Sequence, residues 1–194
     1  MSLGRNPVQI VEIDLPQCTR VYGAAPCAAA LGVTGDRKCY NTIATCQDGA
    51  NYNAGTLTLG ANQNLGAIAG AGDLNLSSYT LTTNSSTSTT FSGNISGTGG
   101  LTKDGSSTLT LSGNNTYTGT TTVSQGTLVL AGTNTGTGTV TVAGGVLRAD
   151  QGVGLNSGSL LTLSGGVLET GANLERSGGS TAGTMQITGG TSGF

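Results

Sequence analysis

Short runs in which Leu, Val or Ile alternate with Thr recur from about residue 54 to the end of the chain. The runs are Thr56–Leu59, Leu74–Leu76, Tyr79–Leu81, Thr108–Leu111, Thr127–Leu130, Thr139–Val142, Leu161–Leu163 and Met185–Ile187. A period of two is typical of strands with one buried face. Because each run is too short to be stable alone, the runs are expected to stack. The pattern therefore predicts an all-β fold, a parallel β-solenoid.

In such a solenoid Leu109, Leu111, Leu128 and Leu130 should point into one internal column, with their Thr neighbours outside. Coils of roughly 20 to 25 residues would give about six coils over residues 54–194. The alternative is a β-sandwich of antiparallel hairpins. That fold usually needs several tight Asn-Gly or Asp-Gly turns, and the chain has only Asp48-Gly49 and Asp104-Gly105. The solenoid is therefore the favoured interpretation.

The composition changes sharply near residue 50. All three prolines and all four cysteines precede it, whereas only five of the 35 glycines do. We therefore divide the chain into a cysteine-rich domain, residues 1–50, and a Gly/Thr-rich solenoid, residues 54–194. The first domain opens with a predicted strand at Val8–Leu15, and so few residues can bury only a marginal core.

The four cysteines are candidates to stabilise that small domain through disulfides or a metal site. Cys18, Cys27, Cys39 and Cys46 are separated by eight, eleven and six residues. Four cysteines permit three disulfide pairings. A zinc site usually has closer pairs of cysteines, whereas an iron–sulfur cluster can take four thiolates from separated loops. Spacing alone leaves these alternatives open.

Residues 5–52 resemble a cysteine domain of tail-tip proteins from lambda-like phages. The resemblance rests on Asn6–Leu15, on Pro26-Cys27, on Lys38–Thr42, on Thr45–Asp48, and on the eight- and six-residue cysteine spacings. It implies that Cys18, Cys27, Cys39 and Cys46 ligate a [4Fe–4S] cluster. It also implies docking onto other tail-tip or hub proteins, and a location in the virion.

Residues 91–173 resemble the passenger-associated repeat of bacterial autotransporters, most closely over Gly100–Leu130. That resemblance implies a right-handed parallel β-helix that carries an adhesin to the cell surface. The two resemblances lead to two functional hypotheses. The favoured one is a structural phage tail protein with a β-helical stalk directed toward a host receptor or glycan, and the alternative is an autotransporter-type adhesin.

The composition of the chain argues against several kinds of partner and catalytic site. The net charge is −2 and the seven basic residues form no cluster, so no nucleic-acid partner is expected. The chain has no His, which excludes Ser-His-Asp and Cys-His catalytic units. The longest apolar stretch, residues 24–33, is too short to span a membrane, and residues 1–17 lack the apolar core of a secretory signal.

A glycan-cleaving tail spike is a distant third hypothesis, because it would need paired carboxylates. Glu169 and Glu175 are the candidate pair, and solvated surface charges are the simpler interpretation. Tyr117 is interpreted as a core residue in preference to a sugar-stacking one. We therefore expect a protein that is not an enzyme, and that could form homo-oligomers.

Overall fold

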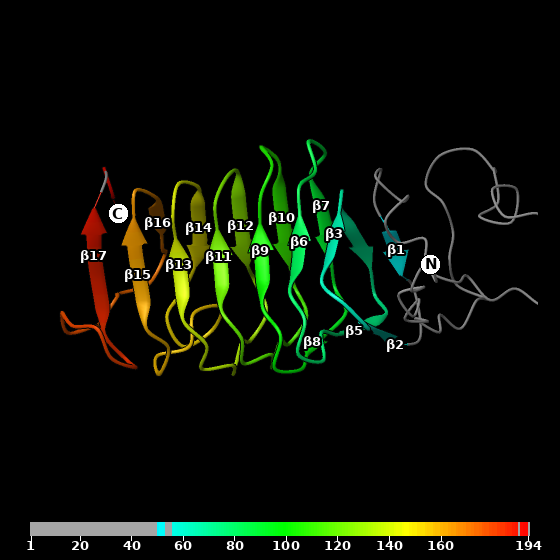
Figure 1. Ribbon diagram of the computed structural model, residues 1–194. Helices are drawn as coiled ribbons and strands as arrows, with labels where there is room; N and C mark the ends of the chain where they lie inside the picture. Colours follow the sequence, from blue (N-terminus) through cyan, green and yellow to red (C-terminus); the bar gives the residue numbers. More distant parts are fainter. Residues whose placement is uncertain (1–49, 53–55, 190, 194) are drawn as a thin grey trace, which may run out of the picture.

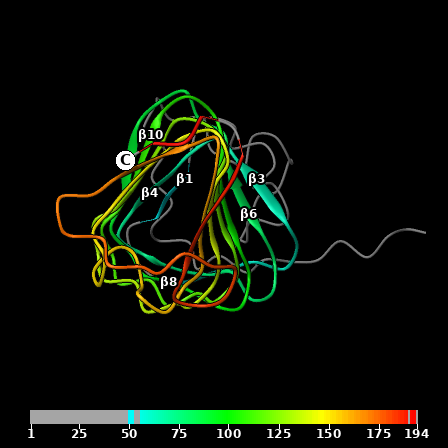
Figure 2. The ribbon, with the colours of Figure 1, turned by 90° about the vertical axis from the view of Figure 1, so that its left-hand side faces the viewer.

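The computed structural model describes residues 50–52, 56–189 and 191–193. In these residues the chain winds into a parallel β-solenoid, a rod whose strands lie side by side (Figure 1). Viewed along its axis, the rod has a three-cornered outline (Figure 2). Every strand pair in the described residues is parallel, which confirms the predicted solenoid and excludes the hairpin sandwich.

Two long sheets and one short sheet form the three sides of the rod. The first, sheet A, contains β1 (Ala50–Tyr52), β4 (Ile68–Gly70), β7 (Thr89–Phe91), β10 (Thr108–Leu111), β12 (Thr127–Leu130), β14 (Val146–Ala149) and β16 (Val167–Glu169). Sheet B is short and contains β2 (Thr56–Thr58), β5 (Asp73–Asn75) and β8 (Ile95–Ser96). Sheet C contains β3 (Gln63–Leu65), β6 (Leu81–Thr83), β9 (Leu101–Lys103), β11 (Thr121–Val123), β13 (Val140–Val142), β15 (Leu161–Ser164) and β17 (Met185–Gly189).

The chain visits the sheets in the same order on each turn, so the seven strands of sheet A number seven coils, from coil 1 at β1 to coil 7 at β16. Leu109, Leu128 and Leu147 stack directly in register, so the intervals between them give the length of a coil. Both of these coils are slightly shorter than the predicted coil length of roughly 20 to 25 residues. Seven coils are present where about six were expected, because shorter coils divide the same length of chain into more turns.

The core is a set of aliphatic columns that run along the rod. Leu109, Leu111, Leu128 and Leu130 are all buried, and the Thr residues beside them are more exposed, as the alternation predicted. Each coil contributes few apolar side chains, so burial becomes effective only when neighbouring coils cover one another. Ile187 illustrates this dependence: it stacks on the buried Leu163, but it lies on the last strand of its sheet and is 57% exposed.

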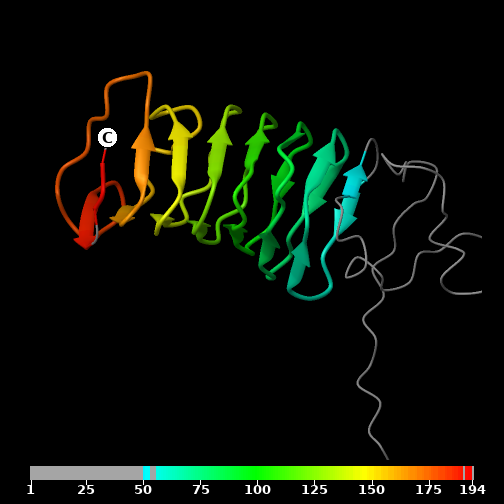
Figure 3. The ribbon, with the colours of Figure 1, turned by 90° about the horizontal axis from the view of Figure 1, so that it is seen from above.

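Coil 7 departs from the regular winding. A long segment between β16 and β17 extends away from the outline of the other coils, as the orange trace in Figures 2 and 3 shows. Leu161 on β15 still pairs with Met185 on β17, although the chain between them is longer than between Val140 and Leu161 one turn earlier. The extra residues are accommodated outside the stack, so sheet C continues through its last strand.

Glycines line one corner where successive coils approach closely. A Cβ atom added to Gly113 would lie 2.1 Å from the carbonyl oxygen of Gly93, and one added to Gly132 would lie 2.0 Å from that of Gly113. Real Cβ atoms do not approach oxygen so closely. This corner therefore requires glycine in consecutive coils, and the spacing between coils sets that requirement.

Replacing Leu109 by Asp tests the internal column. The change buries an unpaired carboxylate, so it should cost several kcal/mol and lower the midpoint of thermal unfolding markedly. The matched control is Thr110→Asp, which places the same side chain on the outer face and should cost about 1 kcal/mol or less. Equal midpoints for the two variants would contradict the inward orientation of Leu109.

Replacing Gly113 by Ala tests the corner. The new methyl group would overlap backbone atoms of the adjacent coil, so a loss of about 1–3 kcal/mol or more is expected. Gly178→Ala is the control, because a Cβ atom there meets nothing within 4 Å. Its unfolding midpoint, measured by circular dichroism, should stay close to that of the parent chain. If Gly113→Ala is equally benign, the coils are not packed as described.

Candidate functional site

The sequence-predicted metal site lies outside the described residues. Cys18, Cys27, Cys39 and Cys46 all belong to residues 1–49, so the [4Fe–4S] site remains a prediction. Within the described part of the chain, His, Cys, Asp and Glu side chains form no group of three or more that could hold a metal ion. Nor do residues 50–52, 56–189 and 191–193 contain a helix able to cross a membrane.

Of the two residues considered for glycan cleavage, Glu169 engages its carboxylate in an ion pair, whereas the bond formed by Glu175 comes from its backbone. Glu169 forms an ion pair with Arg148 on the adjacent strand, with Nη2 and Nε at 2.5 and 2.7 Å from Oε2. The backbone N–H of Glu175 instead donates to Gln151 Oε1 at 3.2 Å. The ion pair is solvent-exposed, and such pairs contribute roughly 0–1 kcal/mol. Glu169 is thus a surface charge paired across two coils.

The projecting segment of coil 7 is fastened to coil 6 by polar contacts. Asp150 Oδ1 accepts hydrogen bonds from the backbone N–H of Gly171 at 2.6 Å and from Thr170 Oγ1 at 3.1 Å. The guanidinium of Arg176 donates to the carbonyl oxygens of Ser159 and Asn156. These bonds hold the projecting segment against coil 6.

A polar cluster lies inside the rod, where coils 3 to 6 meet. Its members are buried or half-buried polar side chains at inward positions, several of which other coils fill with Leu, Val or Ile: Lys103, Asn115, Tyr117, Thr121 and Asn134. Sequence reasoning placed Tyr117 in the core but missed the other four. Their positions could have revealed two of them, because Lys103 and Thr121 each occupy an inward position of a strand with the alternating pattern.

Lys103 is the charged member of this set, and its ammonium bonds to the turn after β9 and to the next coil instead of to the other four side chains. It lies between Thr83 and Val123 in an inward column of sheet C and is 1% exposed. Its Nζ donates to the carbonyl oxygens of Asp104 and Gly105, both at 2.7 Å, and is 3.4 Å from that of Gln125 on the next coil. An ammonium has three donor protons, and these carbonyls match them. Burial lowers the pKa of Lys103, and the nearby Asp104 carboxylate opposes that shift.

Tyr117 and Thr121 form a buried hydroxyl pair within coil 4. Their oxygens are 2.7 Å apart, and both side chains are almost fully buried. Burial raises the pKa of Tyr117 to about 12, and the hydrogen bond with Thr121 partly opposes that rise. The expectation that Tyr117 belongs to the core is thus confirmed.

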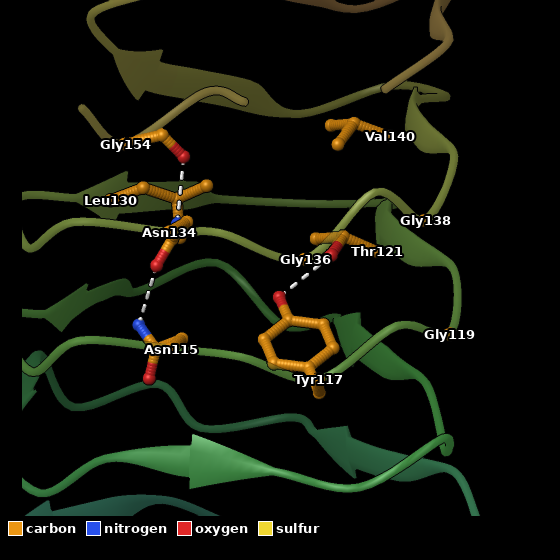
Figure 4. A pocket seen from close by; sticks show the side chains of 10 residues that line it. All are labelled: Asn115, Tyr117, Gly119, Thr121, Leu130, Asn134, Gly136, Gly138, Val140 and Gly154. Atoms are coloured by element: carbon orange, nitrogen blue, oxygen red, sulfur yellow. Dashed lines mark hydrogen bonds between the residues drawn. The ribbon is translucent and has the colours of Figure 1, made fainter. Parts of the chain in front are cut away.

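Two stacked asparagines continue the side of the rod that sheet B begins. Asn115 Nδ2 donates to Asn134 Oδ1 on the next coil at 2.8 Å, and Asn134 Nδ2 donates to the Gly154 carbonyl at 2.7 Å (Figure 4). Asn115 Oδ1 accepts from the backbone N–H of Ile95 at 3.0 Å. Beyond β8 the described residues form no further strand of sheet B; Asn115 and Asn134 form an isolated bridge, and the N–H of Asn134 donates to the Val153 carbonyl at 2.8 Å. The amide ladder thus joins coils where regular strand pairing is reduced.

A small cavity lies beside these groups. Its volume is about 20 Å³, and Asn115, Tyr117, Thr121 and Asn134 all line it (Figure 4). The polar cluster is engaged in bonds both within coils and to adjacent coils, and the chain offers it no His to act as a base. The arrangement is therefore suited to holding coils together.

Comparison with known proteins agrees with this description. A family model described as "Passenger-associated-transport-repeat" matches residues 101–130 and again 125–149. No curated protein and no solved structure matches the chain. The two matched segments run from β9 to β14 and contain the whole polar cluster. The repeat and the solenoid fit an autotransporter-type passenger or a β-helical stalk.

The raised pKa of Tyr117 predicts a dependence of stability on pH. Because the folded-state pKa exceeds the usual value of 10, the stabilisation is complete below pH 10 and is lost as the pH rises toward about 12. A shift of two pKa units corresponds to about 2–3 kcal/mol. The parent chain should therefore lose about that much more unfolding free energy than Tyr117→Phe between pH 9 and 12.

Comparing two chains that differ only at Tyr117 removes contributions that both share. These include Lys103, whose lowered pKa gives the opposite dependence on pH. Chemical denaturation at several pH values provides the measurement. Parallel curves for the parent and Tyr117→Phe would show that Tyr117 ionises normally and is not buried as described.

Proposed function

We propose that the solenoid is a passive β-helical stalk of an autotransporter-type surface passenger, and not an enzyme. The repeat match over residues 101–149 carries the proposal, since it coincides with the best-stacked coils. A stalk needs length and stiffness more than a binding pocket. Coils that contact mainly their neighbours provide both, because each added coil lengthens the rod without changing its cross-section.

The outer surface is consistent with a passive role. Outward positions along sheet C are Thr in five consecutive coils, Thr82, Thr102, Thr122, Thr141 and Thr162. Thr suits strands and tolerates solvent. Charged residues make up only 8% of the chain, so a strong electrostatic attraction to an ionic partner is not expected.

Localisation in the organism that makes the protein tests the proposal. Antibodies raised against the solenoid should label the surface of intact producing cells, and brief treatment of those cells with an external protease should remove the label. Labelling confined to permeabilised cells, or to the tails of purified virions, would contradict a surface passenger.

The phage-tail hypothesis depends on residues 5–52 and finds no specific support in the described residues. It remains a prediction with a separate test. Protein purified without oxygen should contain four iron and four sulfide per chain, with the visible absorbance of a [4Fe–4S] cluster. Cys18→Ser, and likewise each of the other three Cys→Ser changes, should lose the iron while the solenoid stays folded.

Two disulfides in anaerobically handled protein would rule out the cluster. Iron-free protein with four reduced thiols would do so too. Neither result would affect the stalk, which depends on the coils after residue 56.

A further inference from the structure

The cavity is partly open to solvent and lies where the composition of one internal column changes. On the side of sheet B the inward positions are filled by Leu57, Leu74 and Ile95 in coils 1 to 3. Asn115 follows in coil 4 and Asn134 in coil 5. An amide fills less of the interior than a stacked Leu or Ile, and the cavity opens beside these amides.

The backbone at this corner prevents side chains from filling the cavity. Gly119, Gly136 and Gly138 contribute to its lining. A Cβ atom on Gly136 would lie 1.9 Å from the carbonyl oxygen of Tyr117, and one on Gly138 would lie 2.1 Å from that of Gly119. The close approach of coils 4 and 5 thus requires glycine here, and the cavity follows from that requirement.

The cavity has the volume for one water molecule and the lining to hold it. Its volume is about 20 Å³, whereas a single water needs about 10–15 Å³ on the same measure. Cavities that stay dry are lined by apolar side chains alone, whereas this one has two amides and two hydroxyls in its lining beside Leu130 and Val140.

Two donor protons in the lining are not used by the bonds described above. The hydroxyls of Tyr117 and Thr121 have two protons, and the bond between them uses only one. Asn134 Nδ2 has two protons and donates one to Gly154. Asn115 Nδ2, in contrast, uses both of its protons, on Gly113 and Asn134. Leaving a buried donor without an acceptor costs free energy. An acceptor is therefore expected for the two remaining protons.

We propose that this cavity is a hydration site, in which one water molecule accepts hydrogen bonds from the Tyr117–Thr121 hydroxyl pair and from the Asn134 amide. The water connects coil 4 to coil 5 at the side where strand pairing is reduced to a single bridge. Buried waters typically make about three hydrogen bonds to protein groups. Asn134 Oδ1, which accepts one bond from Asn115, has a second lone pair to receive a proton from the water.

A high-resolution crystal structure of the whole chain tests the site directly. We expect one ordered water at about 2.7–3.2 Å from a hydroxyl of the pair and from Asn134 Nδ2. Asn134→Leu removes the amide donor and places a larger apolar side chain beside the cavity, so the water should be expelled. Thr122→Val, on the outer face beside Thr121, is the control and should keep the water.

A measurement in solution covers the case in which Asn134→Leu does not fold. Oxygen-17 relaxation dispersion detects waters that stay bound for long times, and it does not respond to hydroxyl protons of the protein. The parent chain should show such a water, and Tyr117→Phe/Thr121→Val, which removes both hydroxyls, should lose it. A parent structure without water in the cavity, or with a water bonded to neither group, would overturn the proposal. So would an unchanged water in Asn134→Leu or in the double variant.

Discussion

Stacking of parallel coils in register is the interaction on which the rest of the structure depends. Each strand of sheets A and C hydrogen-bonds to the strand one turn away, and the side chains then fall into columns. No single coil encloses a core, so the burial of Leu109 depends on Leu128 in the next coil. Stability is therefore a property of neighbouring coils, and exposure appears where a neighbour is missing, as at Ile187.

The close spacing of coils explains both the glycine corners and the internal polar cluster. Where backbones approach too closely for a Cβ atom, as at Gly113 and Gly136, the sequence is restricted to glycine. Where the aliphatic column is interrupted, Asn115 and Asn134 bond to each other, and Lys103 bonds to backbone carbonyls. Buried polar groups persist in proteins when they are paired, and these groups are paired both within their own coil and across coils.

Sequence reasoning predicted the fold class and the inward Leu positions, because runs such as Thr108–Leu111 contain two inward residues and show the period of two. It missed strands such as β8 and β16, because a strand of two or three residues contains too few inward positions to reveal a period. Apart from Tyr117, the polar cluster was also missed. Lys103 and Thr121 occupy inward positions of alternating strands, but a search for alternating apolar residues passes over polar side chains at those positions.

Distances along the rod test the stacking most directly. Spin labels introduced through a non-natural amino acid at Thr82 and at Thr141, Thr162 or Gln186 would report separations of three, four and five coils. Parallel strands about 4.8 Å apart predict mean separations of about 14, 19 and 24 Å, a linear increase with the number of coils. Separations that do not rise steadily with coil number, or that vary broadly for each pair, would contradict a solenoid stacked in register.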